Sequence, residues 1–152
     1  MNLDWIHLHL MVNHLPVVLA LVGAVASVIA LIVKRAGVWR YAAVTMLLAG
    51  LLAPVALLSG GQAEDAAEDA WYVSRAAIHD HEEAAEKAMW VTVVAGAVAV
   101  VALWKKGPRW RLAMAVVAVV AAGAMIYASF EGGEIVHRSP QLERAPDSRP
   151  AS

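Results

Sequence analysis

Four long stretches of this chain contain no charged residue, and each is long enough to cross a lipid bilayer. They cover residues 15–33, 41–59, 88–104 and 112–130, so each has 17 to 19 residues. A membrane-spanning helix needs roughly 17 to 25 predominantly apolar residues. Lipid offers no hydrogen-bond partner to a backbone N–H or C=O group, so a spanning segment must be a helix or a strand of a closed barrel. Barrel strands alternate apolar and polar residues, whereas these runs are apolar without interruption. The sequence therefore predicts an all-α integral membrane four-helix bundle.

The composition agrees with this fold, because 61% of the 152 residues are hydrophobic and only 16% are charged. We expect one transmembrane domain over residues 1–137, with helices at about 8–34, 39–60, 76–105 and 109–131. The first positive residue, Lys34, follows the first apolar block, whereas a signal peptide carries positive charge ahead of its apolar core. The first block is therefore expected to remain as a helix. The Pro-, Ser- and charge-rich residues 138–152 are expected to be disordered.

Basic residues cluster in the two short connections between the apolar blocks. The seven are Lys34, Arg35, Arg40, Lys105, Lys106, Arg109 and Arg111. Positive residues beside short loops mark the cytoplasmic side. The acidic connection over residues 60–87 and both termini then lie on the outer side. We expect a multi-pass membrane protein in contact with the lipid bilayer, with its histidines at or near the outer interface.

Three ionisable side chains are predicted to reach one height near the outer ends of the helices. His14 precedes Lys34 by 20 residues, which is roughly 30 Å of helix. His81 precedes Lys105 by 24 residues, and Glu64 follows Arg40 by 24, which is roughly 36 Å in each case. These residues are therefore expected to converge on one site.

His137 is expected to join this layer from the fourth helix. It follows Arg111 by 26 residues and would lie slightly higher than the others. Gly132 and Gly133 permit a bend, because glycine adopts backbone conformations that other residues avoid. Such a bend would fold His137 back over the bundle.

Only one of the two histidines that open the third helix can point inward. His79 and His81 are two residues apart, and residues at that spacing do not share a helical face. We favour His81, because a stripe of small residues follows it at helical spacing. The stripe consists of Ala84, Ala85, Ala88, Thr92, Ala95 and Gly96. It indicates either close helix packing, which is the commoner cause, or room for a cofactor.

Four motifs resemble a group of small bacterial four-helix membrane proteins, the DUF2231-like family. They are Asn13-His14-x-Pro16, Ser59-Gly60-x-x-Ala63-Glu64, Ile78-x-x-His81-Glu82-x-Ala84-Ala85 and Gly132-Gly133-x-Ile135-x-His137. The resemblance spans nearly the whole chain. The family's opening pattern, His-Pro-x-x-x-His-Phe-Pro, is matched by His9-Leu10 and His14-Leu15-Pro16 without its first proline and its phenylalanine, which weakens a role for His9. His7 and His9 are both left out of the site, because polar residues commonly lie at the water interface beside an aromatic residue such as Trp5.

The resemblance implies electron transfer, because related domains are fused to c-type cytochrome modules. It selects His14, Glu64, His81, Glu82 and His137 as the matching positions. It also implies a location in the bacterial inner membrane, with the histidine cluster facing the periplasm or the cell exterior. A periplasmic cytochrome or another redox protein is the partner that it implies.

The first hypothesis for the site is a non-covalent haem b with His14 and His81 as axial ligands. His137 would cover the haem edge or act as an alternative ligand. Glu64 and Glu82 would accept hydrogen bonds from the imidazole N–H groups and tune the potential of the iron, and Asn13 would support the site from its position beside His14. Covalent haem attachment is excluded, because the chain has no cysteine.

The second hypothesis is a bare transition-metal ion such as zinc, copper or iron. Its ligands would be His14, His81 and His137 with Glu64 or Glu82, because imidazole and carboxylate suit these metals. A third reading is a structural subunit of a membrane complex with an interfacial histidine cluster.

Several other functions lack support in the sequence. There is no phosphate-binding glycine loop, Gly-x-Ser-x-Gly elbow or cysteine nucleophile, so no catalytic residue is assigned. An electron-transfer or binding protein is therefore favoured over a stand-alone enzyme. Nucleic-acid binding is disfavoured, because the net charge is −1 and topology accounts for the basic turns. The spans also carry no charge at mid-membrane depth, which disfavours a channel or a pump.

Overall fold

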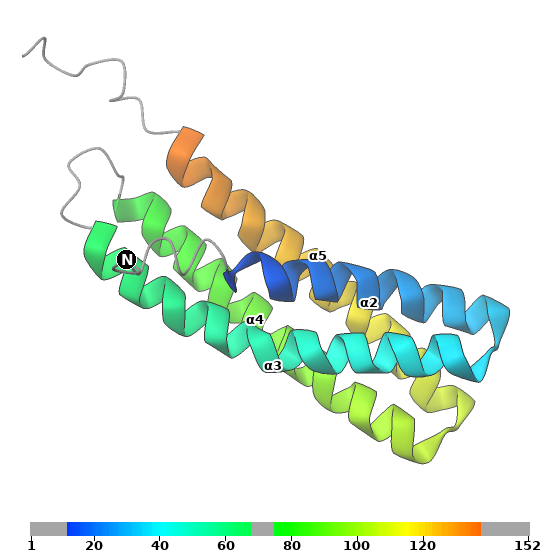
Figure 1. Ribbon diagram of the computed structural model, residues 1–152. Coiled ribbons are helices and arrows are strands. Elements are labelled where there is room, and N and C mark those ends of the chain that lie inside the picture. The colour runs from blue at the N-terminus through cyan, green and yellow to red at the C-terminus, as the bar shows by residue number, and fades with distance from the viewer. Residues whose placement is uncertain (1–11, 68–74, 138–152) are drawn as a thin grey trace, which may run out of the picture.

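The computed structural model consists of four helices, and it describes residues 12–67 and 75–137. The side chains of residues 62–67, 75–77 and 134–137 lie outside this description. The helices are α2 (His14–Val33), α3 (Ala36–Ala67), α4 (Arg75–Lys105) and α5 (Pro108–His137) (Figure 1). No strand occurs within the described ranges. The predicted all-α, four-helix fold is confirmed.

The helices form a closed ring in chain order. α2 packs against α3, α3 against α4, α4 against α5, and α5 returns to α2. The α2–α3 and α4–α5 turns lie at the same end of the bundle, whereas the opposite ends of α3, α4 and α5 extend past the start of α2 (Figure 1). The molecule is therefore an up-and-down bundle with one short helix and three long ones.

The distribution of apolar side chains suits a lipid environment. All four helices are long and apolar enough to span a membrane, over His14–Val33, Ala36–Gly61, Ile78–Lys105 and Pro108–Gly133. Large side chains such as Ile32, Leu51 and Val94 point out of the bundle, while most buried apolar positions are alanines. A soluble protein buries its large apolar residues instead. The chain is therefore suited to cross a bilayer four times.

Small residues allow the backbones of α3 and α4 to approach closely. A Cβ atom added at Gly50 would come within 3.0 Å of the Thr92 carbonyl oxygen and 3.2 Å of the Gly96 Cα atom. The Thr92 hydroxyl is fully buried and donates to the Ala88 carbonyl of its own helix at 2.7 Å. The small-residue stripe on α4 thus serves helix packing at this depth.

At the end opposite the two turns, two helices continue further than the sequence predicts. α3 passes through Gly60 and Gly61 to Ala67, and α5 passes through Gly132 and Gly133 to His137. No described glycine has a positive φ angle, so the predicted bend at Gly132 and Gly133 is wrong. The neighbouring helix α4 also extends at this end, and its side chains pack against α5. Three parts of the prediction lie outside the described residues. They are the start of the first helix at residue 8, the histidines His7 and His9, and the disordered tail at residues 138–152.

Candidate functional site

His81 links α4 to α5 at the end of the bundle opposite the two turns, which we call the histidine end. Its Nδ1 atom lies 3.0 Å from the carbonyl oxygen of Ala128, and the side chain is partly buried. A carbonyl oxygen can only accept a hydrogen bond, so Nδ1 carries the proton. In the neutral imidazole, Nε2 then keeps its lone pair. The hydrogen bond therefore prepares Nε2 of His81 to act as a ligand.

The imidazole of His81 rests against the backbone of α5 at Gly132. A Cβ atom added at Gly132 would lie 2.9 Å from Cε1 and 3.2 Å from Nδ1 of His81. Any side chain larger than hydrogen would therefore displace the ring. The neighbouring Gly133 is different, because a Cβ atom there would meet nothing within 4 Å. The first glycine of the pair thus provides space for His81 rather than a bend.

The remaining polar residues at the start of α4 face outward. His79, Glu82 and Glu86 are exposed. Glu83 is exposed as well, and it accepts a 2.7 Å hydrogen bond from Lys87. The preference for His81 over His79 as the inward residue is confirmed. The hydrogen-bond partner that the structure gives to His81 Nδ1 is the Ala128 carbonyl, not a carboxylate.

His14 lies at the same end of the bundle, as the first residue of α2. Its side chain is exposed. One turn further into the bundle, Val17 packs against a buried cluster that contains Ala20, Ala84 and Ala128. Ala84 is also one turn from His81, and Ala128 is its hydrogen-bond partner. Each histidine is therefore one helical turn from a residue that belongs to this buried cluster or packs against it.

Asn13 places a polar atom beside His14. Its Oδ1 atom is buried and has no hydrogen-bond partner among the described residues. Asn13 also provides no side-chain cap for α2. A buried acceptor without a donor is costly, so this amide oxygen is suited to receive a hydrogen bond from a group that binds at the outer end.

The packing inside the bundle limits how deep a cofactor can lie. Below His81, the side chains of Ala84 and Ala88 are buried, and Thr92 is fully buried. At the level of Thr92, a Cβ atom added at Gly50 would come within 3.0 Å of the Thr92 carbonyl oxygen, so α3 and α4 leave no room for a cofactor between them there.

Glu64 and His137 are positioned by their helices, and their side chains lie outside the described residues. Both belong to uninterrupted helices, α3 and α5. His137 follows Ala128 by nine residues, which is roughly 13 Å along the helix axis. It follows Gly132 by five residues, or about 8 Å. His137 is thus further out than His81, toward the rim of the site.

The described side chains do not by themselves form a metal centre. Among them, no three or more of His, Cys, Asp and Glu are grouped closely enough to hold an ion. His14, His81 and Glu82 belong to the described set, whereas the side chains of Glu64 and His137, the other ligands expected from the sequence, do not.

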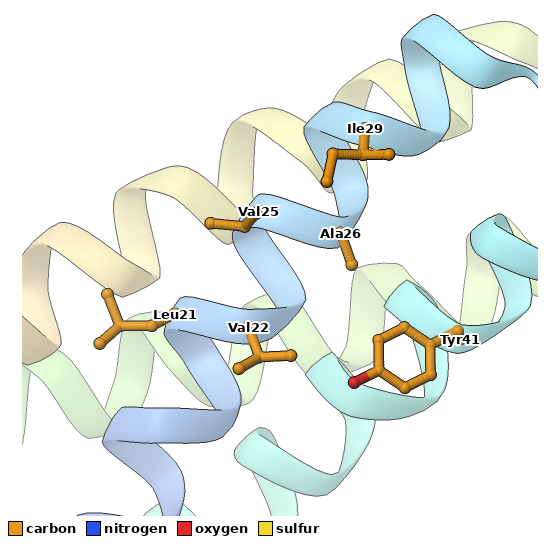
Figure 2. Close-up of a pocket in the computed structure, with 6 residues that line it drawn as sticks. All are labelled: Leu21, Val22, Val25, Ala26, Ile29 and Tyr41. Carbon is orange, nitrogen blue, oxygen red and sulfur yellow. The ribbon is translucent and has the colours of Figure 1, made fainter.

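Two shallow apolar grooves flank α2, and neither belongs to the histidine end. Figure 2 shows the groove between α2 and α3, which is lined by Leu21, Val22, Val25, Ala26, Ile29 and Tyr41. The other lies between α2 and α5 and includes Val119 and Gly123. Both have almost wholly apolar linings. They are surfaces against which lipid chains can pack.

Sequence reasoning missed Ala128 and Gly132 as parts of the site. Ala128 contributes only its backbone carbonyl, which has no residue signature. Gly132 did carry a signal, because glycine inside a helix is unfavourable and needs a packing reason. No protein-family model, no curated protein and no solved structure matches this chain. The resemblance to the DUF2231-like family therefore depends on its four motifs alone.

Proposed function

We propose that this protein holds a b-type haem at the outer end of its bundle and transfers electrons. His14 and His81 are the axial ligands in this proposal. In this proposal the protein lies in the inner membrane of a bacterium, and its termini and its histidine end face the periplasm. Its partner is a periplasmic cytochrome or a similar redox protein. The basic turns at the opposite end support this orientation.

The observation that carries the proposal is the hydrogen bond between His81 Nδ1 and the Ala128 carbonyl. Imidazole ligands commonly donate their second ring N–H to a carbonyl or a carboxylate, which fixes the tautomer and the ring orientation. The close contact with Gly132 holds the ring from a second side. Together the two contacts hold the ring in one orientation, which an axial ligand requires.

The remaining residues of the motifs have supporting roles. When bound, the haem supplies a reversible one-electron iron couple. Asn13 offers its unpaired Oδ1 as an acceptor beside His14. Glu64 and His137 border the site from α3 and α5. Glu82 is exposed and acts only through its negative charge.

A bare transition-metal ion is the second candidate. Imidazole nitrogen suits zinc, copper and iron, and the prepared Nε2 atom of His81 serves such an ion as well. This candidate needs Glu64 or His137 as an additional ligand, because the described side chains alone form no such group. Haem needs only two axial histidines, which is why we favour it. A structural subunit without a cofactor is the third candidate.

Haem content of purified variants tests the proposal. The protein is produced with a haem precursor, purified in detergent, and assayed for haem per polypeptide as wild type, His14→Ala, His81→Ala and His79→Ala. His79 is the matched control, since it is exposed and only two residues from His81. We expect both ligand variants to lose haem and the control to keep it. Full haem retention in either His14→Ala or His81→Ala would remove that residue from the ligand set.

A further inference from the structure

The turn end of the bundle carries positive charge without any compensating negative charge. Seven Lys and Arg residues lie in or beside the two turns, and residues 12–63 and 88–130 contain no Asp or Glu. The ion pair that the structure gives among described side chains, Lys87 with Glu83, is near the opposite end. The positive turn end is therefore available for an anion from outside the chain.

Two tryptophans and an arginine form the inner layer of this end. Trp39 is only 4% exposed and lies at the start of α3, and Trp110 packs against the same core cluster from the start of α5. The guanidinium carbon of Arg111 lies 5.5 Å from the centre of the Trp39 ring. Arg109 lies 5.8 Å from the Trp110 ring centre. The aromatic rings thus fix the positions of two guanidinium groups.

Three hydrogen-bond donors in this layer have no acceptor. The Nε1 atoms of Trp39 and Trp110 and the Nε atom of Arg111 are buried and unpartnered among the described residues. Leaving one buried donor unpaired costs about 1–3 kcal/mol. The rule that places positive residues in cytoplasmic turns explains the charge, but it does not explain three unpaired donors beneath it. An anion with several acceptor oxygens would satisfy both features.

We propose that this layer binds the phosphate of an anionic phospholipid. A phosphodiester has two free oxygens, and a guanidinium can donate to both at once. The three unpaired atoms have almost no accessible surface, so the phosphate first meets the exposed lysines of the turns and then reaches the inner donors as the turn side chains rearrange. This proposal does not depend on the haem.

A lipid is a better source of this phosphate than a soluble ion. Trp104 is 85% exposed and precedes Lys105, and Tyr41 is 57% exposed and follows Arg40. Exposed aromatic residues of this kind mark the level of the lipid headgroups. Exposed Ile32 and Leu112 lie next to the basic residues and can contact the acyl chains of the same lipid. Basic pockets between transmembrane helices bind anionic headgroups in this manner.

Native mass spectrometry and thermal unfolding of the full chain test the proposal. The chain is reconstituted in nanodiscs of phosphatidylcholine alone, or of phosphatidylcholine with phosphatidylglycerol. The variants are Arg111→Gln, Arg111→Lys and Trp39→Phe. Arg40→Gln is the matched control, because it removes the same charge from an exposed position next to Trp39.

We expect phosphatidylglycerol to remain bound to the wild type and to raise its unfolding temperature. Arg111→Gln should weaken this binding about tenfold, and Arg40→Gln by less than about threefold. Arg111→Lys keeps the charge but not the bidentate donor, so it should lie between them. Trp39→Phe removes one unpaired donor, so phosphatidylglycerol should raise its unfolding temperature by less than it raises that of the wild type, each compared with the same protein in phosphatidylcholine.

Three results would overturn the proposal. The first is that Arg111→Gln and Arg40→Gln weaken phosphatidylglycerol binding equally, which would indicate that the lipid is attracted to any positive residue of the turn end. The second is the absence of a preference for phosphatidylglycerol over phosphatidylcholine. The third is an equal rise in unfolding temperature when millimolar inorganic phosphate is added in phosphatidylcholine, which would identify a soluble anion as the ligand. If Arg111→Gln fails to fold, the comparison of Arg111→Lys with the control decides.

Discussion

The imidazole of His81 on α4 lies against the Cα atom of Gly132 on α5, and no side chain fits between them. A methyl group at Gly132 would come within 2.9 Å of Cε1 of His81. The ring is held at the same time by the Ala128 carbonyl, 3.0 Å from Nδ1. These contacts make α5 a support for the proposed ligand, although α5 contributes no described side chain to it.

Gly132→Ala should lower haem affinity about 10- to 100-fold, which is the usual effect of disturbing the support of a ligand. The added methyl group pushes the His81 ring away from Ala128, so Nε2 changes direction. Haem content and the absorption spectrum of the purified variant measure this effect. Gly133→Ala is the control, because its methyl group meets nothing within 4 Å. Equal haem content in the two variants would show that the contact with Gly132 does not position the ligand.

Gly50→Ala should destabilise the bundle by about 1–3 kcal/mol, because its methyl group meets the rigid backbone of α4 at Thr92 and Gly96. Unfolding in mixed detergent micelles measures the change in the free energy of unfolding. Gly123→Ala is exposed and meets no atom within 4 Å, so it should be neutral or stabilising by about 0.5–1 kcal/mol through helix propensity. A loss of stability at Gly123 as large as at Gly50 would contradict the close packing of α3 and α4.

Thr92→Val should change the free energy of unfolding by less than about 1 kcal/mol, even though Thr92 is fully buried. Its hydroxyl donates to Ala88 of its own helix and holds no other helix in place. The same unfolding assay applies. A much larger loss of stability would mean that the hydroxyl connects two helices.

The number of helices and their order could be predicted from the sequence, because apolar runs without charge have few alternatives in a bilayer. The inward direction of His81 also followed from helical spacing. The continuation of α5 through Gly132 and Gly133 could not be predicted. Glycine permits a bend but does not require one, and the residue that packs against Gly132 in the continuous helix, His81, lies 51 positions earlier in the chain.

The orientation of the protein can be tested because the chain has no natural cysteine. We expect a cysteine at position 79 to react with a membrane-impermeant maleimide in spheroplasts, and a cysteine at position 106 to react only after lysis. Both His79 and Lys106 are exposed, so burial does not confound the comparison. The reverse labelling pattern would place the histidine end in the cytoplasm and exclude a periplasmic redox partner.

The visible absorption spectrum of the purified protein, before and after reduction with dithionite, tests the central proposal most directly. The protein is produced in cells supplied with a haem precursor and is purified in detergent together with His81→Ala. We expect a Soret band and sharp α and β bands in the reduced wild type, as six-coordinate haem gives, and their loss in His81→Ala. A colourless wild-type protein would contradict the haem proposal and leave the metal ion and the structural subunit as the remaining candidates.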